Sequence, residues 1–216
     1  AITGDFSLPG THNCIASVTC TGDQVVSNDQ LPVALHNSSF FSIFPYSESF
    51  ESGPGGWYSA GQNSSWGHGV PNGSYIYYAN SGTNCWVTNP IGNYNNNEQS
   101  YVESPCFDFS LLTNPFLDFY YWIYTYEDYD GAQIQYTIDG VTWHTIGDVN
   151  YPPNPSGWYN IDYIQGLSFT GNTIGWSSAG FNWLYTEHPL EFLAGEPFVK
   201  FRFVWGSDGS YNYYDG

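Results

Sequence analysis

The chain has 216 residues, of which 20% are aromatic, and it carries twenty acidic side chains against two basic ones, a formal net charge of −18. Electrostatic repulsion at this charge excludes nucleic acid and anionic membrane surfaces as binding partners. No apolar run approaches the roughly 18 residues that span a bilayer, so membrane insertion is excluded as well. Two interpretations of the acidity stay open: it keeps a secreted protein soluble, or it is compensated by bound cations.

The first 45 residues differ in composition from the rest. They contain few aromatic residues before Phe40 and a polar run over Thr21–Gln30. This pattern predicts that residues 1–45 form a linker or the end of a neighbouring module, and that residues 46–216 form the main domain. The chain contains no methionine, not even at position 1, which indicates a processed or excised piece of a longer protein.

Strand signals begin early in the main domain and continue to its end. The run Phe116–Tyr126 is too aromatic for a surface loop, and residues 132–138 alternate apolar and polar side chains, which is typical of a half-buried strand. Asp139-Gly140 then predicts a two-residue hairpin turn, with Val141–Ile146 folding back antiparallel. The sequence therefore predicts an all-β fold, a two-sheet antiparallel β-sandwich.

Two further segments complete this interpretation. Asn93–Asn97, NYNNN, is too polar to pack and is expected to be a loop. Residues 199–205 alternate again and predict a strand whose two basic residues, Lys200 and Arg202, share one face. We expect both to neutralise carboxylates on adjacent strands rather than to bind a ligand.

Four cysteines form an even set at positions 14, 20, 85 and 106. In a chain poor in lysine, this favours an oxidising, extracytoplasmic setting, secreted or on the cell surface. Among three formal pairings we expect Cys14 with Cys20 and Cys85 with Cys106; free buried thiols are the alternative. No CxxC spacing occurs, which disfavours zinc.

Several ordered segments resemble one known family, the MAM-like, concanavalin-type jelly-roll modules of large secreted bacterial proteins. They are SFESGPGGW, SSWGHGVP, SG-x-x-CWVTNPIGNYNNNEQSYVESPCFDFS, YEDYDGAQIQYTIDGVTW and FVKFRFVWGSDGS. Such modules belong to cell-surface adhesins, including those of gliding bacteria that use Type 9 secretion, and to secreted peptidases. The resemblance covers roughly Tyr46–Gly216 and implies a jelly roll whose last strand, with an Asp-Asp pair, is missing here.

Calcium is the cation that this sequence favours. In the resemblance, Phe50-Glu51 matches a position where related jelly rolls often place a calcium carboxylate. Glu127, Asp128 and Asp130 cluster before Gly131 and offer the hard oxygen ligands that calcium takes, without EF-hand spacing. An acidic turn that caps backbone groups is the equal alternative for this tract.

Carbohydrate is the second candidate ligand. Aromatic rings stack on sugars and polar side chains bind their hydroxyl groups. Five tryptophans lie in loop-like segments rich in Gly or Asn and are candidate contacts: Trp57, Trp66, Trp158, Trp176 and Trp183. The alternative for each ring is a place in the core between the sheets.

No catalytic motif stands out, since the five histidines form no HExxH and no GxSxG occurs. The sequence therefore favours a noncatalytic extracellular module for adhesion or substrate binding, with a surface glycan or protein as ligand and other domains of the same long chain as neighbours. The alternatives are an accessory domain of a secreted peptidase and a jelly-roll carbohydrate-active enzyme, whose paired carboxylates would leave no trace in sequence spacing.

Overall fold

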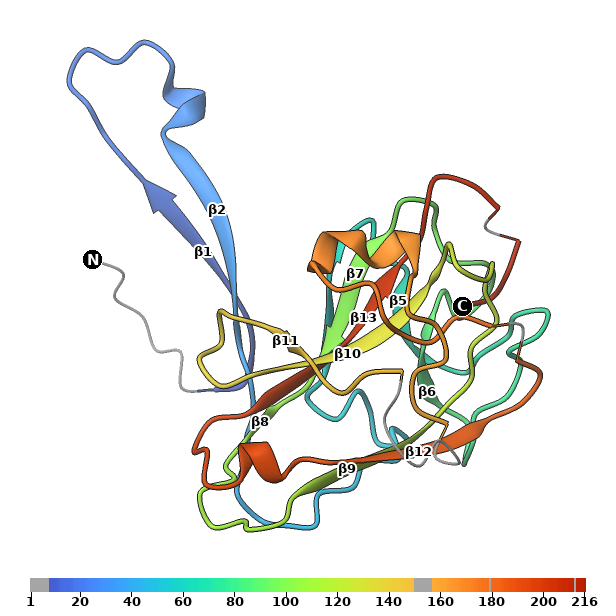
Figure 1. Ribbon diagram of the computed structural model, residues 1–216. Helices are drawn as coiled ribbons and strands as arrows, with labels where there is room; N and C mark the ends of the chain where they lie inside the picture. Colours follow the sequence, from blue (N-terminus) through green and yellow to red (C-terminus); the bar gives the residue numbers. More distant parts are fainter. Residues whose placement is uncertain (1–7, 150–156, 179, 212) are drawn as a thin grey trace. The chain divides into compact units, whose positions relative to one another are not determined.

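The computed structural model describes residues 8–149, 157–178, 180–211 and 213–216 (Figure 1). The chain divides into two compact units, Ala1–Ser39 and Phe40–Gly216. Residues 40–45, expected to belong with the N-terminal segment, are part of the larger unit. There Phe41 pairs with Phe107 in β3 (Phe40–Phe41) and β8 (Cys106–Phe107), and Phe44 packs against the core.

The smaller unit is a hairpin. Strand β1 (Gly10–Ser17) pairs antiparallel with β2 (Gln30–Asn37), and the short 3-10 turn η1 (Val26–Asn28) lies in the connection. Apolar side chains of the hairpin are solvent-exposed, Ile15 to 66% and Leu31 to 63%. Two strands without a covered face are marginally stable at best on their own.

The larger unit is built from short strands and two 3-10 turns. The remaining strands are β4 (Tyr58–Gln62), β5 (Trp66–Gly69), β6 (Cys85–Thr88), β7 (Gln99–Glu103), β9 (Phe116–Tyr121), β10 (Gly131–Thr137), β11 (His144–Thr145), β12 (Leu184–Pro189) and β13 (Lys200–Gly206). The 3-10 turns are η2 (Gln165–Thr170) and η3 (Glu191–Leu193). Within the described residues no helix is long and apolar enough to cross a membrane.

The larger unit has two packed layers, which confirms the expected all-β sandwich. One layer is a five-stranded antiparallel sheet in the order β11-β10-β13-β7-β4. The pairs β9–β12 and β5–β6 form the opposite layer, and in Figure 1 β9 and β12 run below the sheet. The rings of Phe119 in β9 and Phe203 in β13 meet edge to face at 4.9 Å across the interior.

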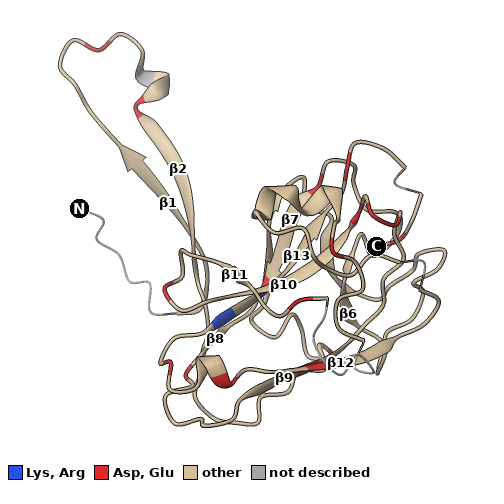
Figure 2. Cartoon of the chain, in the orientation of Figure 1, with Lys and Arg blue, Asp and Glu red and all other residues tan. Residues whose placement is uncertain are grey.

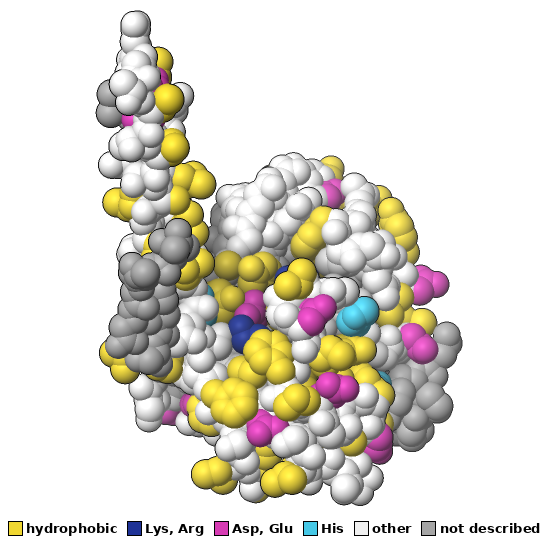
Figure 3. All heavy atoms as spheres, turned by 90° about the vertical axis from the view of Figure 1, so that its left-hand side faces the viewer, with side chains coloured by type: hydrophobic (Ala, Val, Ile, Leu, Met, Phe, Trp, Pro, Cys, Tyr) yellow, Lys and Arg dark blue, Asp and Glu magenta, His cyan; other side chains and the backbone are white. Residues whose placement is uncertain are grey.

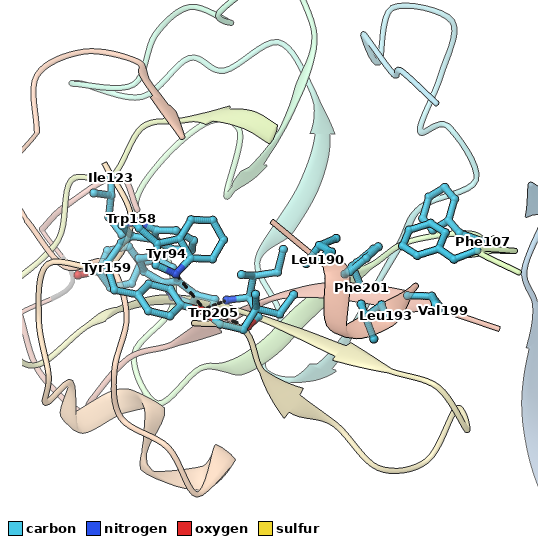
Figure 4. Close-up of a cluster of buried hydrophobic side chains, with 14 residues drawn as sticks. Tyr94, Phe107, Ile123, Trp158, Tyr159, Leu190, Leu193, Val199, Phe201 and Trp205 are labelled. Carbon is cyan, nitrogen blue, oxygen red and sulfur yellow. Dashed lines mark hydrogen bonds between the residues drawn. The ribbon is translucent and has the colours of Figure 1, made fainter. Parts of the chain in front are cut away.

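Aromatic side chains dominate the core between these layers (Figure 4). Trp205 is 2% exposed, and its ring contacts that of Tyr94 at 4.8 Å. Tyr94 comes from the Asn93–Asn97 loop, which was expected to be too polar to pack. The segment is a loop, but its tyrosine is completely buried because the ring fills core volume while its hydroxyl group reaches Asp130.

The predicted hairpin forms with a different turn. Gln135 pairs with Thr145 and Tyr136 with His144, so β11 is much shorter than the expected Val141–Ile146. The Asp139 carboxylate accepts hydrogen bonds from the backbone N–H groups of Val141 (2.8 Å) and Thr142 (2.7 Å). This side-chain turn competes with the two-residue hairpin turn and lengthens the loop.

The face of β10 that carries Gln133 and Gln135 is buried, whereas the sequence pattern of a half-buried strand predicted that this face is exposed to solvent. Gln133 is 0% and Gln135 2% exposed. Gln135 donates to Gln133 (2.8 Å), Gln133 donates to the carbonyl of Asn172 (2.7 Å), and η2 covers Val204 on the neighbouring strand. Glutamine can be buried here because its amide groups are hydrogen-bonded.

The two basic side chains lie on the same face of β13, as expected, but have different partners. Lys200 forms an ion pair with Glu103 of β7, at side-chain exposures of 11% and 8%. Arg202 instead donates to the Gln135 side chain and lies 4.2 Å above the Trp143 ring. Figure 2 shows that acidic residues, by contrast, are spread over the connecting loops.

The expected disulfides are absent: Cys14, Cys20, Cys85 and Cys106 are all free thiols. Cys14 lies within β1, and Cys20 lies beyond its end, where its thiol points to the carbonyl of Thr21. Cys85 and Cys106 belong to strands of different sheets and pack as small apolar side chains. Burial raises the pKa of the Cys85 thiol to about 12 and also raises that of Cys106.

Candidate functional site

A group of aromatic rings that are mostly partly or fully exposed, here called the tyrosine surface, lies beside the C-terminal segment. It consists of Tyr75, Tyr124, Tyr126, Tyr129, Phe181, Tyr211 and Tyr214. The rings form a connected series: Tyr75 stacks on Tyr124 at 3.9 Å, and Tyr126 stacks on Tyr129 at 4.8 Å. Tyr214 joins both halves, at 5.3 Å from Tyr124 and 6.2 Å from Tyr126. Rings that pack against each other are pre-organised, which lowers the entropic cost of binding a ligand.

Several members of the tyrosine surface are open to solvent. Tyr129 is 39%, Tyr211 57% and Phe181 73% exposed. A hydrogen bond with the Tyr75 side chain, and after it burial, raises the pKa of Tyr124 to about 12. Tyr124 itself is buried, at 8% exposure, and its hydroxyl group stays protonated at neutral pH.

Exposed apolar side chains are not confined to the tyrosine surface. Figure 3 shows hydrophobic side chains gathered on the lower part of a face of the larger unit, with acidic side chains among them. Leu111 (93%) and Val141 (82%) are exposed residues outside the tyrosine surface. Scattered apolar exposure is common on protein surfaces, so the connected rings, rather than exposure alone, distinguish the tyrosine surface.

The acidic residues next to the tyrosine surface, Glu127, Asp128 and Asp130, lie in different environments. Glu127 and Asp128 are exposed, whereas Asp130 is completely buried. Asp130 accepts hydrogen bonds from the Tyr94 hydroxyl (2.6 Å) and the backbone N–H of Asp208 (2.7 Å). Burial raises the pKa of Asp130 to about 6 despite these hydrogen bonds.

Glu51 holds a loop in place. Its carboxylate accepts hydrogen bonds from the backbone N–H groups of Thr83 (2.9 Å) and Asn84 (2.7 Å) and from the Thr83 hydroxyl (2.8 Å). These bonds lower the pKa of Glu51. In the described part of the chain no three His, Cys, Asp or Glu side chains form a group that could hold a metal ion. Glu51 and the acidic tract are therefore not brought together, and calcium stays a prediction.

A cavity of about 740 Å³ lies between the two layers of the larger unit. Its lining combines Phe203 and Trp205 of the five-stranded sheet with β6 and β9 of the opposite layer. Most lining residues are apolar, with carboxylates at Glu48 and Asp118. Cavities of this size and composition are typical of ligand sites.

The five tryptophans predicted as ligand contacts fall into different environments. Trp158 and Trp176 are each 2% exposed and belong to the core. Trp57, Trp66 and Trp183 are partly buried and line the cavity, which buried Trp176 also lines. Trp183 also donates to the carbonyl of Tyr78 (2.9 Å).

Three indole groups in the cavity lining have an unused donor. The Nε1 atoms of Trp66, Trp86 and Trp205 are buried and have no hydrogen-bond partner among the described residues. A buried donor without an acceptor costs about 1–3 kcal/mol. Three of them around one cavity therefore favour an occupant that supplies acceptors.

Sequence reasoning missed the tyrosine surface because it concentrated on tryptophans in loops. The signal that could have found it is the density of tyrosine in Tyr120–Tyr129 and Tyr211–Tyr214. Alternate positions of an extended segment share a face, so spaced tyrosines such as Tyr124 and Tyr126 predict one aromatic surface.

No family model matches this chain. Bacillopeptidase F of Bacillus subtilis (strain 168) is 31% identical over 130 residues, which is 60% of this chain; the chain spans only 9% of that protein's length. A solved structure from work on carbohydrate-binding modules of the β-sandwich superfamily is also similar. The alignment covers 99% of this chain and 76% of that structure's chain, at 14% sequence identity and a TM-score of 0.42. A score this low carries no argument about ligand or fold.

Proposed function

We propose that this chain is a noncatalytic, extracellular binding module of a larger secreted protein, and that its tyrosine surface holds a neutral glycan. The observation that carries this proposal is the connected series of rings from Phe181 through Tyr124 and Tyr126 to Tyr211. Flat aromatic rings supply apolar faces, and their hydroxyl groups supply hydrogen-bond partners at the same surface.

Charge favours a neutral ligand over an acidic one. The exposed carboxylates of Glu127 and Asp128 follow directly on Tyr126, and the whole chain carries a formal charge of −18. Like charges brought together at an interface weaken binding. A neutral polysaccharide avoids this repulsion, whereas an acidic polysaccharide does not.

Glycan-array binding with two matched variants tests the proposal. Tyr211 and Tyr163 are both 57% exposed, but only Tyr211 belongs to the tyrosine surface. We expect Tyr211→Ala to weaken binding of a neutral glycan about tenfold, equivalent to about 1.4 kcal/mol, and Tyr163→Ala to leave it unchanged. Equal effects of the two variants, or no bound glycan, would contradict the proposal.

A second candidate is an accessory module of a secreted peptidase, and the similarity to Bacillopeptidase F supports it. In that role the chain would hold protein substrates. Immobilised unfolded casein tests this alternative: retention of casein that Tyr211→Ala abolishes, without glycan binding, would favour it. A role in cell-surface adhesion, including the Type 9 secretion context, rests on the resemblance of the sequence motifs.

A further inference from the structure

The outer face of the five-stranded sheet contains both basic side chains of the whole chain. Lys200 and Arg202 alternate along β13 with Phe201 and Phe203, whose rings pack in the core, so the basic side chains point away from it. In Figure 3 the basic side chains lie near the middle of the face shown, among hydrophobic and acidic side chains. In a chain with twenty acidic residues, the positive charge is therefore concentrated at one place.

A carboxylate compensates only one of these two positive charges. Lys200 forms the ion pair with Glu103, whose carboxylate also forms a hydrogen bond with the Tyr58 hydroxyl group. In the part of the chain that the structure describes, no acidic side chain forms an ion pair with Arg202. Its Nε and Nη2 atoms instead donate to one amide oxygen, Oε1 of Gln135, at 2.8 and 2.6 Å. A guanidinium group has five N–H donors, so Arg202 keeps donors that are available to a ligand.

Aromatic rings and a hydrogen-bonded side chain hold the guanidinium group in one position. Its carbon atom lies 4.9 Å from the centroid of the Tyr101 ring in β7 and 4.2 Å from that of the Trp143 ring, next to β11. β7 and β11 lie on opposite sides of β13 in the sheet order. Gln135 is fixed in turn, because it donates to Gln133 (2.8 Å). A ligand that binds Arg202 therefore orders few side chains, which favours binding.

Burial makes a carboxylate the fitting partner for this arginine. Desolvation by burial lowers the pKa of Arg202 below its ordinary value of 12.5. A partly buried cation without an anionic partner is costly, and a planar guanidinium group pairs with a carboxylate through two parallel hydrogen bonds. The two basic side chains and Glu103 together leave one net positive charge, two positive minus one negative. One carboxylate neutralises it.

We propose that Arg202, Tyr101 and Trp143 form a second ligand site, which binds one uronic acid residue of an otherwise neutral glycan. The carboxylate pairs with the free donors of Arg202, and the sugar ring contacts the aromatic rings beside it. The formal charge of −18 repels a polyanion, whereas a single carboxylate interacts mainly with the nearest charges, because exposed charges more than about 8 Å away are screened at physiological ionic strength.

This second site rests on the proposed glycan-binding function but shares no residue with the tyrosine surface. Two probes that differ in one group test it: methyl glucuronide has a carboxylate where methyl glucoside has a hydroxymethyl group. We expect the glucuronide to bind the 216-residue chain saturably and to shift the NMR signals of the Trp143 indole and the Arg202 Nε–H. The glucoside should bind at least about tenfold more weakly, since it lacks the charge-assisted hydrogen bonds.

Variants of the site separate specific recognition from attraction between charges. Arg202→Lys keeps the positive charge but loses the planar pair of donors, and should weaken glucuronide binding at least about tenfold. Trp143→Ala, which leaves the sheet intact, should weaken it as well. Tyr120→Ala is the control, because Tyr120 is 52% exposed on β9 in the opposite layer. Circular dichroism of each variant verifies that it folds.

Three results would overturn the proposal: no saturable glucuronide binding at millimolar concentration, equal binding of the two sugars, or equal effects of Trp143→Ala and Tyr120→Ala. Acetate that binds as tightly as the glucuronide would overturn the glycan ligand, since the sugar ring would then contribute nothing. Tyr211→Ala, the variant of the tyrosine surface, should leave glucuronide binding unchanged, so that failure of one site is distinguishable from failure of the other.

Discussion

The Tyr94 hydroxyl donates to Asp130 Oδ2 across 2.6 Å, and both side chains are completely buried. Oδ1 of the same carboxylate accepts from the backbone N–H of Asp208 (2.7 Å). One buried carboxylate thus joins the Asn93–Asn97 loop, the start of β10 and the segment after β13. This relationship explains why the acidic tract beside Gly131 contributes a structural residue.

Removing the Tyr94 hydroxyl group should leave the buried Asp130 carboxylate short of a hydrogen-bond donor and destabilise the protein. We expect Tyr94→Phe to destabilise the protein by about 1–3 kcal/mol at pH 7, because the ring still packs against Trp205 while Asp130 Oδ2 loses its donor. Urea unfolding measures the change. At pH 5, where Asp130 is mostly protonated, the loss should be smaller; an equal loss at both pH values would contradict this account.

Asp130 should also give stability an unusual pH dependence. Its pKa is about 6 in the folded protein, above the ordinary value of 3.8. Between these values the folded state binds more protons than the unfolded state, so this residue lowers stability as pH rises from about 4 to 6. Asp130→Asn removes that contribution, and the difference in Tm between wild type and variant should change across this window and stay flat above pH 7. A difference independent of pH would contradict the assignment.

The sequence predicted strands better than it predicted faces. Residues 132–138 and 199–205 form β10 and β13 within one residue of the expected bounds, because local alternation sets strand propensity. Alternation alone could not show that η2 covers the glutamine face of β10. That burial depends on the hydrogen bond from Gln133 to Asn172, which are 39 residues apart in the sequence.

Candidate sites were predictable by residue type but not by position. Trp158 and Trp176 lie in Gly-rich and Asn-rich sequence, yet the fold turns both rings into the core. Of the two expected disulfides, the one between Cys85 and Cys106 would join strands of different sheets, a topology that sequence spacing does not encode. The cavity forms between the two layers, so no single sequence motif predicts it.

Buried and partly buried tryptophans should respond differently to truncation. Trp176 is 2% exposed, contacts Trp158 and Tyr159, and donates to the carbonyl of Gly157 (3.0 Å). We expect Trp176→Ala to destabilise the protein by about 3–5 kcal/mol. Partly buried Trp183 should cost less when truncated. Chemical denaturation of both variants checks the order, and the reverse order would place Trp183 in the core.

Replacing only one partner of the Lys200–Glu103 ion pair should destabilise the protein. Both side chains are nearly buried, so Lys200→Met leaves Glu103 without its cation; we expect a loss of about 3–5 kcal/mol at pH 7. The double variant Lys200→Met with Glu103→Gln should recover much of that stability, since the uncompensated charge is gone. Thermal unfolding of the single and double variants measures the recovery, and an unrecovered loss would assign the effect to packing.

Calcium binding, predicted from Glu51 and the tract Glu127, Asp128 and Asp130, should appear as ligand-dependent stability. A single site predicts about 2.7 kcal/mol of stabilisation when free calcium is a hundredfold above its dissociation constant. Tm is compared in calcium and in chelator for the wild type and for Glu127→Gln with Asp128→Asn, whose side chains are exposed. We expect the calcium-dependent rise in Tm to disappear in that variant. A wild type that melts identically in both buffers would remove calcium from this chain and leave Glu51 with the structural role of holding the Thr83–Asn84 loop.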